Sequence, residues 1–175
     1  PAITIASIKA LELEKDAILL VLPADHCIKD IESFKKSIEE GILFALENKI
    51  VTFGVFPTKA ETGYGYIEAE NFLDFNKILG SKIKRFIEKP NLKKAESLIL
   101  NKKYSWNSGI FLVKGETILN EIKRLEPLIY SICKDSLSAN IYDLSFQRLK
   151  EDIFKKCESI SLDNAVMEKT SLGYV

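Results

Sequence analysis

Residues 17–56 read AILLVLPADHCIKDIESFKKSIEEGILFALENKIVTFGVF, and this stretch decides the fold. Residues 17–23 form an apolar run that ends at proline, which is typical of a strand buried on both faces of a parallel sheet. Asp30 can then cap a helix, in which apolar side chains recur at helical spacing as far as Asn48. Residues 50–56 return to a strand pattern, so the stretch fits one βαβ unit and predicts an α/β fold. The predicted buried stripe of the helix consists of Ile31, Phe34, Ile38, Ile42 and Ala45.

Beyond this unit the chain alternates between strand-like and helix-like stretches. Gly63 and Gly65 break the chain before the next strand, Asn91 can cap a helix that reaches Leu100, and Pro127 separates two later helices. The further predicted strands cover residues 64–69, 82–88 and 108–113, and the further predicted helices cover residues 116–125, 128–134 and 144–156.

The two ends of the chain are abrupt. Residues 1–13 are predicted to be a helix, whereas nucleotide-binding α/β domains normally begin with a strand and a glycine loop. Residues 172–175 resemble the start of a strand that is cut short. We therefore expect the sequence to omit parts of a longer polypeptide.

The composition indicates a globular chain with balanced charge. Of the 175 residues 46% are hydrophobic, enough for one domain with a core, and 25 Lys and Arg balance 25 Asp and Glu. We therefore expect no nucleic-acid or membrane partner, and no apolar run is long enough to span a bilayer. The three cysteines lack a CxxC spacing, which favours a reducing cytoplasmic location. With His26 as the only histidine, a zinc site built from several imidazoles is disfavoured. The sequence is compatible with a homo-oligomer but does not indicate one.

Asp25, in the motif LPADH, follows the first predicted strand. Open α/β sheets bind ligands at the carboxyl ends of their strands, and a carboxylate there can hold Mg²⁺ together with substrate phosphates. The alternative is that Asp25 only caps the loop before the helix. Position alone favours neither interpretation.

Two further motifs lie next to predicted strands. In ETGYGYI, residues 61–67, glycine would let a backbone amide approach a ligand closely, although a tight turn is the simpler interpretation. In FIEKP, residues 86–90, Glu88 can accept hydrogen bonds from vicinal hydroxyls and Lys89 can offer a positive charge to a phosphate. An isolated pair of this kind is more often a solvated strand end.

The last two motifs are equally weak by themselves. Asn107, in WNSG, has an amide that can both donate and accept, which suits a sugar hydroxyl, but a turn-stabilising Asn is the commoner case. Residues 161–170 are predicted to be a short helix or a structured loop behind the cap residue Ser161, and they carry Glu168. A surface turn is the alternative for this segment.

Taken together, the order LPADH, ETGYGYI, FIEKP, WNSGIFLV and DNAVMEKT resembles mannose-1-phosphate guanylyltransferases of the bacterial long form, often fused to a mannose-6-phosphate isomerase. Five short patterns in register are specific, although each alone is common. The resemblance implies a Rossmann-like nucleotidyltransferase fold with a mixed, mostly parallel sheet that lacks its N-terminal part. Residues 1–175 would then be a partial catalytic domain.

The resemblance also implies a reaction, in which GMP passes from GTP to mannose 1-phosphate, giving GDP-mannose and pyrophosphate with Mg²⁺ as the cofactor. On this basis Asp25 is a catalytic residue and metal ligand, and Lys89 is a catalytic residue that meets the sugar phosphate. The implied substrate-binding residues are Tyr64, the Gly65 backbone, Glu88, Lys89, Asn107 and Glu168, of which Tyr64 and Glu168 match less well.

The chain also departs from the family pattern. The family's glycine-rich loop that ends in arginine and grips the triphosphate has no counterpart in residues 1–175, and the second metal carboxylate is expected after Val175. Asn164 stands where the family has Tyr. Two alternatives therefore stay open: a nucleotidyltransferase for another hexose 1-phosphate, and a non-catalytic sugar-phosphate-binding subunit.

Overall fold

The computed structural model describes residues 1–74, 77–138 and 141–175, and within them the chain folds as two compact units. The first unit comprises Pro1–Leu19 and Gly115–Lys169, and the second comprises Leu20–Lys114 and Thr170–Val175. The sequence predicted one partial catalytic domain over residues 1–175 and did not indicate this division into two compact units. In the described part of the chain, no helix has both the length and the apolar character needed to cross a membrane.

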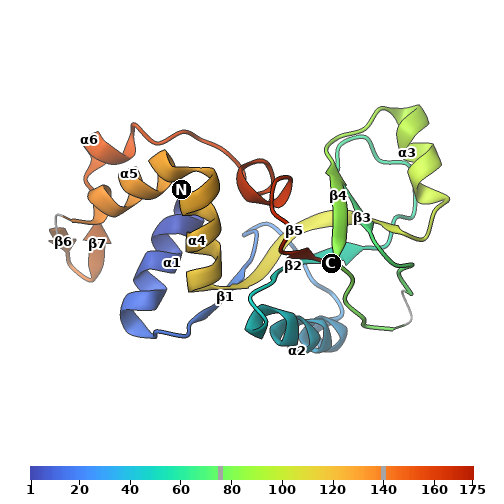
Figure 1. Cartoon of the computed structure of the whole chain (residues 1–175), viewed down its shortest axis with the longest axis horizontal. Coiled ribbons are helices and arrows are strands. Elements are labelled where there is room, and N and C mark those ends of the chain that lie inside the picture. Colours follow the sequence, from blue (N-terminus) through green and yellow to red (C-terminus); the bar gives the residue numbers. More distant parts are fainter. Residues whose placement is uncertain (75–76, 139–140) are drawn as a thin grey trace. The chain divides into compact units, whose positions relative to one another are not determined.

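The first unit is mainly helical. α1 (Ala2–Leu13) begins directly after Pro1, as predicted, and packs against α4 (Gly115–Leu125) and α5 (Pro127–Leu137), as Figure 1 shows. Pro127 occupies the first turn of α5, where its missing N–H is tolerated, and it separates the two helices. The apolar faces of α4 and α5 meet in a core that includes the buried Ile118, Ile122 and Ile129.

The helix predicted over residues 144–156 is wrong. β6 (Ile141–Asp143) and β7 (Phe146–Arg148) instead form an antiparallel hairpin, and α6 (Glu151–Phe154) has only four residues. Leu144 lies in the turn with φ 55°, and Arg148 Nη2 donates to Asp143 Oδ2 across the hairpin at 2.6 Å. A short isolated helix is costly to nucleate, so cross-strand pairing overrides the helical spacing of the apolar residues.

The segment behind Ser161 forms the predicted short helix. η1 (Asp163–Met167) is a π-helix, and Ser161 Oγ accepts from the Asn164 backbone N–H at 3.2 Å, which confirms Ser161 as a cap. Glu168 directly follows this helix, and its backbone N–H donates to the Asp163 carbonyl at 2.9 Å. Glu168 is therefore held at a defined place in the first unit.

The second unit contains a sheet with the strand order β4-β3-β5-β2-β8, and β1 pairs with β5. The strands are β1 (Ile18–Val21), whose last two residues belong to this unit, β2 (Ile50–Val55), β3 (Tyr66–Ala69), β4 (Ile83–Ile87), β5 (Tyr104–Lys114) and β8 (Gly173–Tyr174).

The sheet is mixed, as predicted, but its described ladders are mostly antiparallel rather than mostly parallel. β2 runs parallel to β8, whereas β5 is antiparallel to both β2 and β3, and β3 is antiparallel to β4. Because β3 and β4 are joined without a crossover helix, they can pair only in the antiparallel direction. β5 is inserted between β3 and β2, which places one antiparallel strand at the centre of the sheet.

β1 is less buried than its apolar sequence predicts. Leu20 is 36% exposed, and Leu22, just after the strand, is 50% exposed. Within the described residues β1 pairs with β5 alone, so it lies at an edge of the sheet. The prediction of a strand covered on both faces is therefore wrong for this chain.

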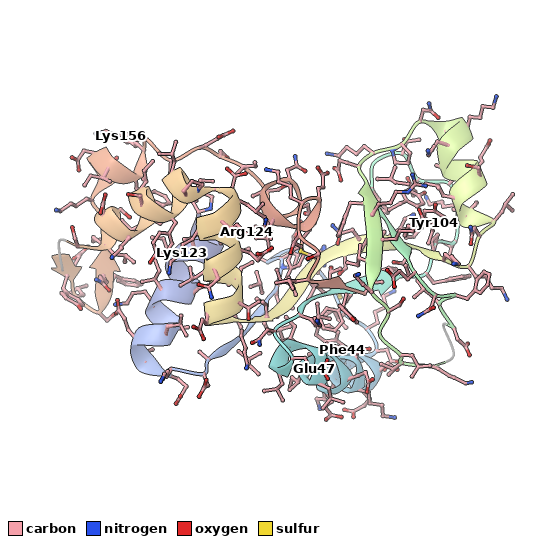
Figure 2. All side chains as sticks on the ribbon, viewed as in Figure 1. Phe44, Glu47, Tyr104, Lys123, Arg124 and Lys156 are labelled. Carbon is pink, nitrogen blue, oxygen red and sulfur yellow. The ribbon has the colours of Figure 1, made fainter. Side chains whose placement is uncertain are left out.

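Two helices cover the sheet of the second unit, and both have the predicted caps. α2 (Ile31–Leu46) begins at Asp30, whose Oδ1 accepts from the Ser33 N–H at 3.0 Å, and it packs against β2 and β5. Ala45 is fully buried on the predicted stripe, whereas Ile31 is 57% exposed. α3 (Leu92–Ile99) begins at Asn91, whose Oδ1 accepts from Lys94 N–H at 2.9 Å. Its core partners on β3 and β5 are Tyr66, Tyr104 and Trp106, of which Tyr104 is labelled in Figure 2.

Candidate active-site cleft

A cleft of about 800 Å³ lies within the second unit. It is lined by the loop after β1, one side of α2, the strands β2 and β5, and the end of the chain. Phe44, labelled on α2 in Figure 2, forms part of the wall, and its ring stacks on that of Tyr174 with centroids 5.0 Å apart. Three of the predicted site residues line this cleft, namely Asp25, Tyr64 and Asn107.

Asp25 is an exposed residue of the loop that follows β1. Asp30 caps α2, as predicted. Within the described residues, no three His, Cys, Asp or Glu side chains gather into a metal-binding group. Asp25 can therefore contribute one carboxylate, which fits Mg²⁺ when substrate phosphates and water supply the remaining oxygen ligands.

The motif WNSG forms a bulge in β5. Thr52 pairs with Phe111 and Gly54 pairs with Asn107. An advance of two residues along β2 therefore corresponds to four residues along β5. Gly109 lies in this bulge with φ 69°, a conformation that glycine adopts at little cost. The bulge breaks the regular alternation of side chains just after Asn107 and so determines where this side chain points.

Asn107 has the turn-stabilising role considered for it, and its contact with a sugar hydroxyl stays a prediction. Its Oδ1 accepts from the Gly109 N–H at 3.1 Å, which stabilises the turn, and it also lies 3.2 Å from Thr52 Oγ1. The Asn107 backbone N–H donates to the Gly65 carbonyl at 2.8 Å. The same residue thus holds the bulge, ties β5 to the glycine motif and lines the cleft.

Gly65, Glu88 and Asn107 are close neighbours. A Cβ at Gly65 would lie 2.8 Å from Glu88 Oε2 and 3.6 Å from Asn107 Cβ, so only glycine leaves this space open. Three motifs that are far apart in the sequence therefore meet at one place. This is the arrangement expected if the three residues contact a single ligand.

Glu88 and Lys89 lie beside the cleft rather than in its wall. Lys89 follows β4 with φ 39°, and its Nζ lies 3.1 Å from Glu88 Oε1. Both side chains are exposed at the strand end, where they pair with each other. The predicted convergence of Asp25 with this pair on one cleft is thus only partly met, because Asp25 lines the cleft whereas Glu88 and Lys89 are not among its lining residues.

Glu168 belongs to the first unit and is exposed directly after η1. Its predicted contact with the substrate stays a prediction.

The profile of the nucleotidyl transferase family matches residues 1–153. The chain belongs to this family. The chain is 43% identical to mannose-1-phosphate guanylyltransferase of Salmonella montevideo over 174 residues, which are 98% of the chain and 36% of that protein. It is 42% identical to the Escherichia coli protein of the same name over 173 residues, which are 97% of the chain and 37% of that protein.

The same fold occurs in the crystal structure of mannose-6-phosphate isomerase from Helicobacter pylori. The TM-score is 0.83 at 32% sequence identity, and the match covers 99% of the present chain and 65% of the Helicobacter pylori chain. The predicted nucleotidyltransferase fold and the family resemblance are therefore confirmed. The chain spans just over a third of the length of the two guanylyltransferases it matches.

Two residues that shape the site were not predicted from the sequence. Tyr66 is fully buried, and its hydroxyl donates to the Glu61 carbonyl at 2.9 Å and accepts from the Glu61 N–H at 3.0 Å, which pins the loop before Gly65. Thr52 contacts the Asn107 side chain from β2. The only local signal for Thr52 is a hydroxyl within an apolar strand, whereas nothing local marks Tyr66.

Proposed function

We propose that the chain is part of a mannose-1-phosphate guanylyltransferase, which transfers GMP from GTP to mannose 1-phosphate and releases pyrophosphate. The observation that carries the proposal is the meeting of Gly65, Glu88 and Asn107 beside a cleft that Asp25 also lines. Identity above 40% over nearly the whole chain to proteins of that name supports the same activity.

In this proposal the sugar lies at the cluster of Gly65, Glu88 and Asn107. The Glu88 carboxylate would accept hydrogen bonds from two neighbouring hydroxyls, and the Gly65 backbone would approach the ring closely because it carries no side chain. Tyr64, whose ring packs edge-on against Trp106 with centroids 5.2 Å apart, would border the sugar. The volume of about 800 Å³ is within the usual range for small-molecule sites.

In this proposal, Lys89 and an Mg²⁺ ion bound by Asp25 would neutralise the negative charge of the phosphates. The Lys89 ammonium would meet the phosphate of mannose 1-phosphate, and the Asp25 carboxylate would hold Mg²⁺. When bound, Mg²⁺ would neutralise charge on the reacting phosphates. A phosphate oxygen of the sugar forms the new bond to the α-phosphorus of GTP, and the bond from that phosphorus to the bridging oxygen breaks as pyrophosphate leaves. No covalent link to the chain is needed, so the residues act by positioning and electrostatics.

We place this reaction in the cytoplasm. Cys27, Cys133 and Cys157 are all free thiols, which suits a reducing compartment. The substrates GTP and mannose 1-phosphate are the partners that the proposal requires, and it requires neither a nucleic acid nor a membrane.

Pyrophosphate release tests the proposal. The protein, expressed with its natural ends, is supplied with Mg²⁺ and each combination of GTP, UTP or ATP with mannose 1-phosphate or glucose 1-phosphate. We expect the fastest release from GTP with mannose 1-phosphate. Faster release from another pair would assign a different hexose or base, and binding of mannose 1-phosphate without any release would identify a non-catalytic subunit.

A further inference from the structure

Two of the three cysteines meet in the first unit. Cys133 lies on α5 and has no exposed surface, whereas Cys157 follows α6 and is partly exposed. The two side chains hydrogen-bond each other, and both residues are free thiols. The β6–β7 hairpin and α6 lie between them in the sequence, so folding of this unit brings the two sulfurs together.

The segment that ends at Cys157 is anchored to α5 at its other end. The Lys150 N–H, just before α6, donates to the Ser136 carbonyl at 2.9 Å, and Lys150 Nζ lies 3.3 Å from Ser138 Oγ. α6 itself has no fully buried side chain, and β6 and β7 form a two-stranded sheet of their own. A covalent bond from Cys157 to α5 would therefore restrain a short helix that packing holds only weakly.

We propose that Cys133 and Cys157 are a site of reversible oxidation, at which a small-molecule disulfide such as oxidised glutathione converts the thiol pair into an intramolecular disulfide. The new bond fastens the end of α6 to α5. In a reducing compartment such a bond is transient and follows the redox state of its surroundings. The site is independent of the proposed transferase activity, since it lies in the first unit and uses none of the residues assigned to the substrates.

The different surroundings of the two thiols set the order in which they react. Burial, followed by the effect of the neighbouring Cys157, raises the pKa of the Cys133 thiol to about 11. Because the thiolate is the reactive form, Cys133 is a poor first nucleophile at neutral pH, and the more accessible Cys157 reacts first. Contact between the two side chains makes the second step intramolecular, which offsets the small thiolate fraction of Cys133.

The reaction is a pair of thiol–disulfide exchanges. The Cys157 sulfur attacks one sulfur of oxidised glutathione, whose S–S bond breaks, and one glutathione leaves with the proton that Cys157 gives up. Cys133 then loses its proton to solvent, its sulfur attacks that of Cys157, and the second glutathione leaves as a thiolate that takes up a proton. Two protein thiols are oxidised, and one glutathione disulfide is reduced to two thiols.

The alternative is that the two thiols only fill space, as buried cysteines often do. In that case Cys133 stays reduced in the folded protein, and Cys157 either stays reduced or stops at a mixed disulfide with one glutathione. The chemical state of each cysteine after oxidation separates the two cases.

The first experiment maps the cysteines by mass spectrometry. The protein, expressed with its natural ends, is incubated without denaturant in an excess of oxidised over reduced glutathione, quenched with acid, alkylated and digested without reductant. We expect the peptides of Cys133 and Cys157 to be joined, and to separate when reductant is added. Alkylated Cys133, glutathione that remains on Cys157, or a bond from either residue to another cysteine would overturn the proposal.

Two variants serve as matched controls under the same conditions. In Cys133→Ala we expect Cys157 to carry one glutathione, because no partner displaces it. In Cys157→Ala we expect the buried Cys133 to stay reduced. A glutathione adduct on Cys133 in Cys157→Ala would contradict the proposed order of the two steps.

The second experiment measures amide hydrogen exchange in the oxidised and the reduced protein. We expect residues 150–157 to exchange at least about threefold more slowly after oxidation, because the bond suppresses local opening of α6. The helix α4, which contains neither cysteine, should exchange equally in both states, and Cys133→Ala treated with oxidised glutathione should show no slowing. Equal exchange of residues 150–157 in the oxidised and the reduced wild-type protein would show that the bond does not fasten this segment, and would overturn the proposal.

Discussion

A Cβ placed on Gly65 would lie 2.8 Å from Glu88 Oε2, closer than real side chains approach each other. The two residues come from the motifs ETGYGYI and FIEKP, which are joined only through the pairing of β3 with β4. Tyr66, next to Gly65, pairs with Ile87, next to Glu88. The contact thus follows from strand register and not from closeness in the sequence.

Gly65→Ala tests this contact. The added methyl group meets the far end of the flexible Glu88 side chain, so we expect Glu88 to move and the free energy of unfolding to change by less than about 1 kcal/mol. The KM for mannose 1-phosphate should rise, whereas the KM for GTP should not. Gly63→Ala is the matched control, because a Cβ there meets nothing within 4 Å. Equal KM values for mannose 1-phosphate in the two variants would show that Gly65 does not contribute to sugar binding.

Asp25→Asn tests the metal ligand. We expect turnover at saturating substrates to fall at least about tenfold while the thermal unfolding curve stays unchanged, because the exposed carboxylate serves the metal and not the fold. Titration with Mg²⁺ should show a higher half-saturating concentration. Asp16→Asn, at an exposed turn of the first unit, controls for the loss of one negative charge. Wild-type turnover in Asp25→Asn would show that Asp25 is not the metal ligand.

Lys89→Ala tests the phosphate contact. Removal of the ammonium should raise the KM for mannose 1-phosphate about threefold to tenfold with a smaller effect on kcat, since the contact exists in the ground state. The positive φ of Lys89 does not complicate the comparison, because Lys and Ala both carry a Cβ. Lys93→Ala, at an exposed position on α3, is the control. A KM that stays at the wild-type value would count against this role.

Tyr66→Phe tests the anchoring of the glycine motif. The variant leaves the Glu61 N–H and carbonyl without the Tyr66 hydroxyl, so we expect a loss of about 1 kcal/mol in the free energy of unfolding, measured in urea. Binding of mannose 1-phosphate should weaken as the loop before Gly65 loosens. Tyr142→Phe, on the exposed hairpin of the first unit, should change neither quantity. Tight binding by Tyr66→Phe would show that the anchor is not needed.

The buried Glu68 predicts a pH dependence of stability. Burial would raise the pKa of Glu68, but hydrogen bonds from Tyr104, Lys84 and Arg85 outweigh it and lower the pKa to about 2 from the usual 4.5. Because the folded-state pKa is the lower one, the stabilisation is complete above about 4.5 and is lost as the pH falls toward about 2.

Glu68→Gln measures this contribution. We expect the wild-type protein to lose roughly 1–3 kcal/mol more than the variant over this pH range, less than the pKa difference alone implies because Lys84 and Arg85 are more than half exposed. Urea unfolding at several pH values provides the comparison. Parallel pH profiles for the two proteins would show that the ionisation of Glu68 is not coupled to folding.

Local sequence signals were sufficient for most helices and strands. Asp30 and Asn91 each cap the helix they were predicted to cap, since a capping side chain bonds a backbone N–H three residues away. The helix predicted from Leu144 onward was wrong because a hairpin depends on pairing between strands, which the local spacing of apolar residues does not reveal. The exposure of Leu20 likewise depends on which strands lie beside β1.

The sequence by itself determined the family, the α/β class and the residue types at each motif, because these depend on local patterns and their order. Only the tertiary structure decided which motifs meet. Strand register brings Gly65 to Glu88, the bulge at Gly109 turns Asn107 toward Thr52, and the ion pair keeps Lys89 with Glu88 at the rim. Such contacts join residues distant in the chain, and their geometry follows from how the strands pair and bend.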